Sequence, residues 1–86
     1  MPKILIVEDD ADIAAIERDY LELNGYQVEV APDGILGLER GLHGEFDLIL
    51  LDLMLPGMDG FSVCRRLREA TDIPILMVTA RQEDID

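Results

Sequence analysis

Short apolar segments alternate along the chain with longer segments whose apolar residues recur every three or four positions. Three of the short segments consist almost entirely of Ile, Leu, Val and Met, and one alternates apolar with polar residues; both patterns are typical of strands. The four segments are KILIV, YQVEV, DLILL and ILMV, at residues 3–7, 26–30, 47–51 and 75–78. The pattern therefore predicts four strands of four or five residues each.

The longer segments have the spacing of amphipathic helices. Asp33 and Asp59 stand where an N-cap is expected, and Asn24-Gly25 supplies a stop signal after the first segment. The predicted helices cover residues 11–23, 35–42 and 60–70.

Two further expectations concern the second and third helices. Gly37 and Gly41 should each weaken the second helix, by up to ~1 kcal/mol. In the third helix, Phe61, Cys64 and Leu67 share one stripe, which we expect to face the core; a core role for Cys64 is favoured over a chemical one.

The strict alternation of strands and helices predicts an α/β fold with a parallel sheet, right-handed crossovers and helices on both faces. The 86 residues are enough for a single small domain, residues 1–86. No apolar run approaches the ~20 residues of a membrane span, and the acidic start does not resemble a signal peptide. The single cysteine, Cys64, favours a reduced, cytoplasmic setting.

The charge balance is strongly acidic. The chain has nineteen Asp and Glu residues and seven Lys and Arg residues, for a net charge of −12. This balance disfavours direct binding of nucleic acid or of an anionic membrane. It favours a bound cation or a basic partner surface.

Several of these carboxylates follow predicted strands. Glu8, Asp9 and Asp10 come directly after the first strand, and Asp52 follows the third, just past the zone that we expect to be covered. In an open parallel sheet, ligands bind beyond the carboxyl ends of the strands. If the strand order is 2-1-3-4, the two groups meet at one edge.

Like charges in such a cluster oppose one another, and a hard divalent cation such as Mg²⁺ removes that cost. Asp10 is explained equally well as the N-cap of the helix that follows it. A strand-end carboxylate is also a possible nucleophile, and next to a cation Asp52 could take up a phosphoryl group. Thr79, after the fourth strand, could reach that group with its hydroxyl, or could begin a capping box with Gln82.

Three motifs resemble the receiver domain of bacterial two-component response regulators. They are KILIVEDD at residues 3–10, LILLDLMLPGMDG at 48–60 and PILMVTA at 74–80. The resemblance implies a flavodoxin-like (CheY-like) parallel sheet, truncated to βαβαβαβ with strand order 2-1-3-4 and without helix 4, strand 5 and helix 5. It is strongest to the class with a winged-helix DNA-binding output domain, no part of which is among the 86 residues.

The resemblance also implies roles for individual residues. Asp52 would be the phosphoacceptor, receiving a phosphoryl group from a histidine kinase in a signalling module that is not an enzyme. Asp9 would bind Mg²⁺ directly and Glu8 through water, with the backbone carbonyl of Met54 as a further ligand. Thr79 and Ala80 would be the switch hydroxyl and the small residue that leaves access to the phosphoryl group.

One element of the receiver pattern has no counterpart. Receivers carry a lysine at the end of strand 5, and the only lysine here is Lys3, at the opposite end of the first strand. We therefore expect impaired phosphorylation. An alternative is an engineered or isolated folding fragment that only self-associates. A phosphatase with a strand-end Asp nucleophile is disfavoured, because Met54 stands where that class has a second Asp.

The missing elements also affect the surface. Without them the fourth strand becomes a bare apolar edge, and an apolar face around the first helix stays uncovered. Bare edges invite pairing with another chain. We therefore expect a homodimer or higher oligomer, formed through the edge of the fourth strand or through the uncovered apolar face.

Overall fold

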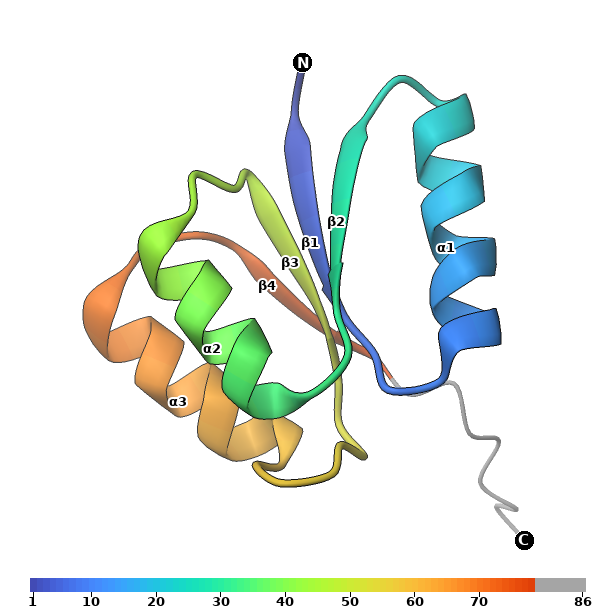
Figure 1. The fold of residues 1–86 in the computed structure, drawn as a ribbon. Coiled ribbons are helices and arrows are strands. Elements are labelled where there is room, and N and C mark those ends of the chain that lie inside the picture. Colours follow the sequence, from blue (N-terminus) through green and yellow to red (C-terminus); the bar gives the residue numbers. More distant parts are fainter. Residues whose placement is uncertain (79–86) are drawn as a thin grey trace, which may run out of the picture.

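The computed structural model describes residues 1–78, which form a parallel sheet with helices on both faces (Figure 1). The strand order β2-β1-β3-β4 confirms the predicted 2-1-3-4 arrangement. Predicted and observed bounds agree closely: β2 and β3 each begin and end one residue later than expected, and α2 extends one residue further at each end. The elements are β1 (Lys3–Val7), α1 (Ala11–Leu23), β2 (Gln27–Ala31), α2 (Gly34–His43), β3 (Leu48–Asp52), α3 (Gly60–Ala70) and β4 (Ile75–Val78).

Each helix begins at an aspartate whose carboxylate accepts hydrogen bonds from backbone N–H groups of the first turn. Asp10 accepts from Asp12 and Ile13 at the start of α1, while Asp33 and Asp59 cap α2 and α3 in the same way. These contacts satisfy amides that have no partner inside the helix. Within residues 1–78, no helix is long and apolar enough to cross a lipid bilayer.

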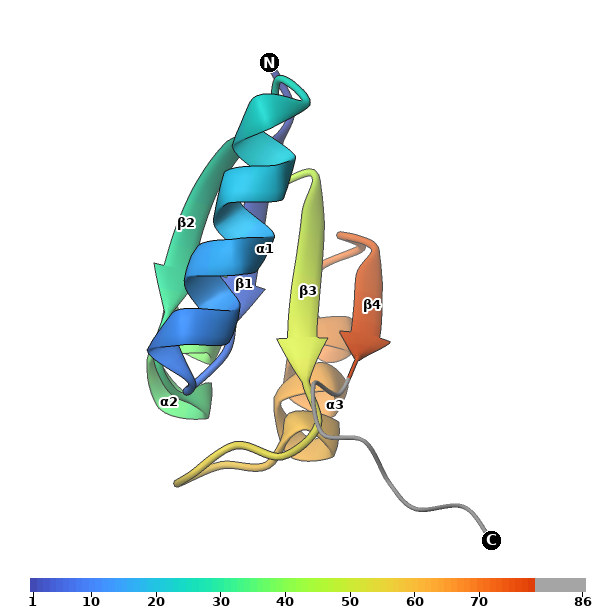
Figure 2. The ribbon, with the colours of Figure 1, turned by 90° about the vertical axis from the view of Figure 1, so that its right-hand side faces the viewer.

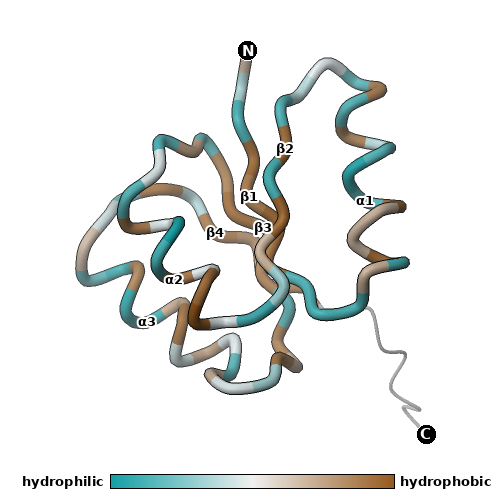
Figure 3. The backbone as a smooth tube through the Cα atoms, viewed as in Figure 1, coloured by the Kyte–Doolittle hydropathy of each residue, from teal (hydrophilic) through white to brown (hydrophobic). Residues whose placement is uncertain are grey.

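One face of the sheet forms the main core with α2 and α3. Leu5, Ile49 and Leu51 from the strands are fully buried there, against Val63 and Leu67 of α3. Figure 3 shows the apolar residues concentrated along the strands. Hydrophobic contact over this face is the main source of stability.

The predicted core stripe of α3 is wrong in one position. Phe61 is 61% exposed, whereas Val63 is fully buried. Cys64 is half-buried and packs against the core, as expected. A helical spacing of three and four residues is compatible with a stripe through Phe61 or through Val63, and only the orientation of α3 on the sheet decides between them.

The opposite face of the sheet is only partly covered. Helix α1 packs over β1 and β2, where Ile4 and Ile6 are 3% and 1% exposed. On β4, which carries the same face, Leu76 is 52% exposed. Figure 2 shows α1 in front of β1 and β2, with β3 and β4 open beside it. The apolar face expected around the first helix is therefore present, and no element within residues 1–78 covers it.

The glycines of α2 are required by packing. A Cβ added at Gly37 would lie 2.6 Å from Cγ1 of Val7, and one added at Gly41 would lie 2.8 Å from Cδ2 of Leu67. Glycine at these positions lets α2 lie directly on β1 and close to α3. The glycines that lower the helix propensity of α2 are thus the residues that allow its close packing on β1 and α3.

We predict that Gly37→Ala destabilises the chain by about 1–2 kcal/mol, although alanine is the better helix former. The added methyl group would meet the branched side chain of Val7, which is buried in a central strand and cannot move aside. Gly41→Ala should cost less, because only the end of the flexible Leu67 side chain must shift. Urea unfolding monitored by circular dichroism measures both changes. A stabilised Gly37→Ala variant would contradict this account.

Candidate metal centre

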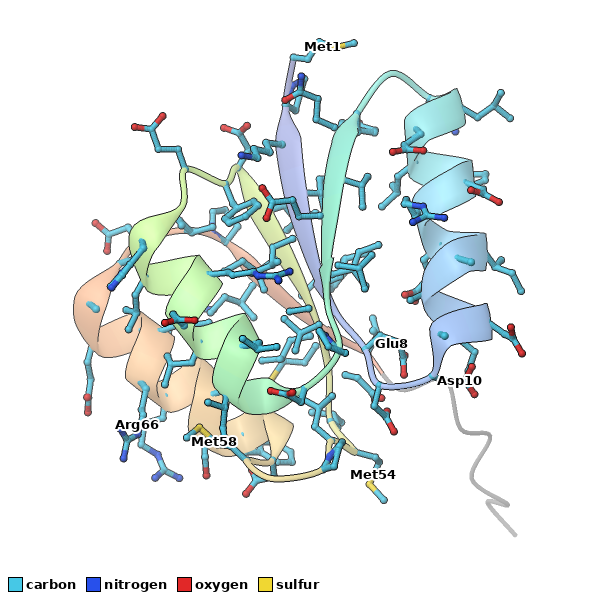
Figure 4. All side chains as sticks on the ribbon, in the orientation of Figure 1. Met1, Glu8, Asp10, Met54, Met58 and Arg66 are labelled. Carbon is cyan, nitrogen blue, oxygen red and sulfur yellow. The ribbon has the colours of Figure 1, made fainter. Side chains whose placement is uncertain are left out.

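Three carboxylates converge at the carboxyl ends of β1 and β3. Glu8, Asp9 and Asp52 each offer an oxygen, and these oxygens lie within 4.8 Å of one another. Glu8 and Asp9 follow β1, while Asp52 ends β3, the strand paired with β1. Figure 4 shows Glu8 at this end of the sheet, near Asp10 and above Met54. The parallel pairing thus brings together residues more than forty positions apart.

Asp52 is more deeply buried than the sequence suggested. It is 3% exposed and belongs to β3 itself, where it pairs with Val78 of β4. The backbone N–H of Leu53 donates to the carbonyl oxygen of Val78 at 3.0 Å, which extends the strand pairing past the expected end. The expectation that Asp52 lies just past the covered zone is therefore wrong. The depth of its burial is set by the tertiary fold and not by its position in the local sequence.

Glu8 is equally buried, at 3% exposure, while Asp9 is exposed. Burial raises the pKa of Glu8 to about 7, and the nearby charge of Asp52 adds to the rise, against a hydrogen bond from the N–H of Asp10 that lowers it. The cluster therefore holds two carboxylates away from water with one open to solution. Its charges oppose one another until a cation or a proton is bound.

The sequence reasoning did not identify Glu17. Burial raises its pKa, and the charge of Asp52 raises it further, so this α1 side chain lies within electrostatic range of the cluster. The only sequence signal was its spacing, four positions after Ile13 on the same flank of the helix. Asp10, by contrast, uses its carboxylate to cap α1.

The loop after β3 is held against the cluster by backbone contacts. The N–H of Met54 donates to Oδ1 of Asp52 at 3.2 Å, and the N–H of Gly60 donates to the carbonyl oxygen of Leu53 at 3.2 Å. A Cβ at Gly60 would overlap the carbonyl oxygen of Asp52, so glycine is needed where α3 starts. Thr79 and Ala80, the other predicted site residues, lie outside the described residues.

The donor set suits a hard divalent cation. All side-chain donors of the cluster are carboxylate oxygens, the ligands that Mg²⁺ prefers, and no nitrogen or sulfur ligand accompanies them within residues 1–78. An open cleft of about 360 Å³ adjoins the cluster and leaves room for further oxygen ligands. It is lined by Asp9, Leu53, Met54, Leu55 and Pro56.

Comparison with known proteins agrees with this architecture. Residues 4–86 match the response regulator receiver domain family. The chain is 48% identical over 82 residues to the transcriptional regulatory protein ResD of Bacillus subtilis, covering 95% of this chain and 34% of that protein. The chain thus spans about a third of the length of such curated relatives.

Solved structures give the same result. A CheY-like receiver domain protein from Methanospirillum hungatei superposes with a TM-score of 0.90 at 32% identity, over 96% of this chain and 67% of that one. The response regulator TrrA of Thermotoga maritima, solved in complex with Mg²⁺-BeF, gives 0.89 at 30% identity, over 94% and 71%. TrrA has also been solved in complex with the histidine kinase ThkA.

We predict that, without divalent cations, stability falls as the pH rises from about 4.5 to about 7. The pKa of Glu8 is about 7 in the folded chain, against an ordinary value of 4.5. Between these values the folded chain keeps a proton that the unfolded chain has released, so raising the pH favours unfolding, by at most about 1.4 kcal/mol per pH unit.

Urea unfolding across this pH range measures the effect. Glu8→Gln should flatten the dependence, whereas Glu69→Gln, at an exposed position of α3, should leave it unchanged. Millimolar Mg²⁺ should recover the stability lost at neutral pH, because it offsets the charge repulsion. An unchanged slope in Glu8→Gln would rule out Glu8 as its source.

Proposed function

The chain belongs to the response regulator receiver domain family, and we propose that Asp52 is its phosphoacceptor and that Mg²⁺ binds beside it. Receiver domains of response regulators are signalling modules rather than typical enzymes. The observation that carries the proposal is the convergence of Glu8, Asp9 and Asp52 at the ends of two paired strands. We further propose that residues 1–86 act as one receiver module in the cytoplasm, where a thiol such as Cys64 stays reduced.

The proposed role of Asp52 follows from its position. One oxygen of its carboxylate would attack the phosphorus in line with the leaving group, forming an O–P bond as the bond to the donor breaks. The N–H of Met54, which contacts Oδ1 of Asp52, helps to hold the carboxylate in place. The carboxylate belongs to a residue that is only 3% exposed, which limits the access of competing water.

Mg²⁺ would be held by Asp9 and Asp52 directly, by Glu8 through water and by the carbonyl oxygen of Met54. When bound, it would screen the charge between the carboxylates and the incoming phosphoryl group. The exposed position of Asp9 suits exchange of the ion with solution, and the buried Glu8 would hold a water ligand of the ion. Support comes from TrrA, a relative solved with Mg²⁺-BeF.

We propose a histidine kinase as the phosphoryl donor. TrrA, which shares the fold of this chain, forms a complex with the histidine kinase ThkA. Thr79 would place its hydroxyl on the phosphoryl group and Ala80 would leave room for it; both roles rest on the resemblance alone. Transcriptional control is proposed for the longer protein class, since relatives such as ResD are transcriptional regulators.

In the 86-residue chain by itself, phosphorylation should be slow. Its only lysine, Lys3, forms an ion pair with Glu29 at 3.1 Å and lies over the ring of Phe46, at the amino end of β1. It therefore cannot neutralise charge at Asp52. Loss of one electrostatic stabiliser from such a site costs roughly 10²–10³ in rate.

The phosphoacceptor prediction is tested with Mg²⁺ and acetyl phosphate, or with beryllium fluoride as a phosphoryl mimic. We expect a slow gain of one phosphoryl group by mass spectrometry, abolished in Asp52→Asn and by removal of Mg²⁺ with EDTA. Asp19→Asn, an exposed carboxylate of α1, serves as the matched control. Modification that persists in Asp52→Asn would show that the acceptor is another residue.

The same experiment tests the alternative reading. If the chain binds Mg²⁺ but takes up no phosphoryl group or mimic, it is a folding fragment without signalling activity. Mg²⁺ binding can be followed independently by its effect on stability. The observation that favours this alternative is the uncovered apolar face beside α1.

We also propose that the 86-residue chain associates with itself, through the edge of β4 or through the uncovered apolar face. Leu76 of β4 and Tyr20 of α1 are more than half exposed, and their burial would be favourable. Light scattering should give a mass above that of a monomer at high micromolar concentration. A well-folded monomer at that concentration would contradict self-association.

A further inference from the structure

Helices α2 and α3 lie side by side on one face of the sheet and leave an open groove between them (Figure 1). The groove has a volume of about 470 Å³ and lies toward the carboxyl ends of both helices, away from the end at which α3 begins beside Asp52. We call it the α2–α3 groove. Its lining residues come from both helices and are Leu38, Leu42, Arg65, Arg66, Glu69 and Ala70.

Apolar side chains form the α2 wall of the groove. Leu38 and Leu42 are four positions apart, which places them on one flank of the helix. Leu38 packs partly against the core, whereas Leu42 is 43% exposed. The wall is fixed in position, because the glycines of α2 hold this helix directly on β1 and close to α3. A partner therefore meets a rigid apolar surface on this side.

The α3 wall carries positive charge, which is scarce in this chain. Of the seven Lys and Arg residues in the sequence, three fall within four positions of α3, at Arg65, Arg66 and Arg68. Arg65 and Arg66 are exposed, and within residues 1–78 neither forms an ion pair. Even Glu69, four positions after Arg65 at the spacing of an intrahelical ion pair, does not pair with it. Figure 4 shows Arg66 extending from α3 away from the sheet.

Stabilisation of the helix accounts for only one of these arginines. Arg68 lies in the last turn of α3, where a positive charge offsets the partial negative charge of the helix end. It does not line the groove, because successive residues of a helix are turned by about 100°. Arg65 and Arg66 precede that turn, and both line the groove. Arginine is also the cation that is enriched at protein interfaces, since its planar guanidinium can form two parallel hydrogen bonds with one carboxylate.

We propose that the α2–α3 groove binds an acidic amphipathic helix of a partner protein. Apolar side chains of that helix pack on Leu38 and Leu42, and its carboxylates pair with Arg65 and Arg66. Charge complementarity selects this occupant, because a neutral or basic helix would leave both guanidinium groups unpaired. Nucleic acid is a poorer match, since the groove sets two arginines beside two leucines and offers no continuous basic surface. The inference goes beyond the proposed phosphoacceptor role and does not depend on it.

Nuclear magnetic resonance of the ¹⁵N-labelled 86-residue chain provides the test. The probe is a synthetic helical peptide of about sixteen Leu and Glu residues, with leucines spaced along one face. We expect the amide signals of residues 38–42 and 65–70 to shift on titration, and binding to weaken as the salt concentration rises. A matched peptide with lysine in place of glutamate should leave these signals unchanged, although the net charge of −12 attracts it to the chain. If a single-stranded oligonucleotide shifts them more than the acidic peptide does, the proposed occupant is wrong.

Substitutions separate the groove from the overall charge of the chain. Arg66→Glu should raise the dissociation constant of the acidic peptide at least ~10-fold, whereas Arg68→Glu, the same change in charge on the same helix, should raise it much less. Glu69→Gln should tighten binding, because it removes a carboxylate from the groove, and Leu42→Ser should weaken it by removing apolar contact.

All four substituted side chains are exposed, so the variants should fold, and far-UV circular dichroism checks that they do. Equal losses of affinity in Arg66→Glu and Arg68→Glu would show that the peptide senses only net charge, and would overturn the inference. Amide signals of the groove that do not respond to the acidic peptide would overturn it as well.

Discussion

The parallel pairing of β1 with β3 is the constraint on which the candidate site depends. Because both strands run in the same direction and in register, with Val7 opposite Leu51, the residues that follow them emerge side by side. Glu8 and Asp52 are thereby brought to one point from distant parts of the chain, with Asp9 next to them at the surface. Helices on both faces hold the two central strands in place, so the carboxylates cannot separate to relieve their repulsion.

The enforced proximity of these carboxylates destabilises the folded chain, and a bound cation would remove that destabilisation. Two carboxylates are buried almost completely, and the raised pKa of Glu8 is the signature of that cost. A chain with no use for the cluster would be more stable with neutral residues there. The retained charge is consistent with the proposed binding of Mg²⁺, because the same burial that destabilises the empty site would strengthen its electrostatic interactions with a bound cation.

The two faces of the sheet are covered to different extents. On the face of α2 and α3, glycines let the helices approach so closely that Leu5, Ile49 and Leu51 are fully buried. On the other face, within residues 1–78, α1 covers β1 and β2, while β3 and β4 have no helix over them.

Local patterns in the sequence determined the elements and much of the site. The apolar runs, the capping residues Asp33 and Asp59 and the strict alternation were sufficient for four strands and three helices, while the order of the sheet came from the resemblance to receiver domains. The carboxylates that follow the first and third strands then identified the members of the cluster. These features could be predicted because each depends on neighbours in the chain or on the general rule for parallel sheets.

Only the tertiary structure decided which faces are buried and how deeply. Asp52 is 3% exposed although it carries a charge, Val63 and not Phe61 enters the core because of the orientation of α3, and Gly37 is needed because α2 lies on Val7. The contribution of Glu17 likewise depends on which flank of α1 turns toward β3. Burial depends on which segments, remote in sequence, pack against one another. Hydrophobic spacing alone leaves the rotation of a helix and the register of a strand undetermined by about one turn or one residue.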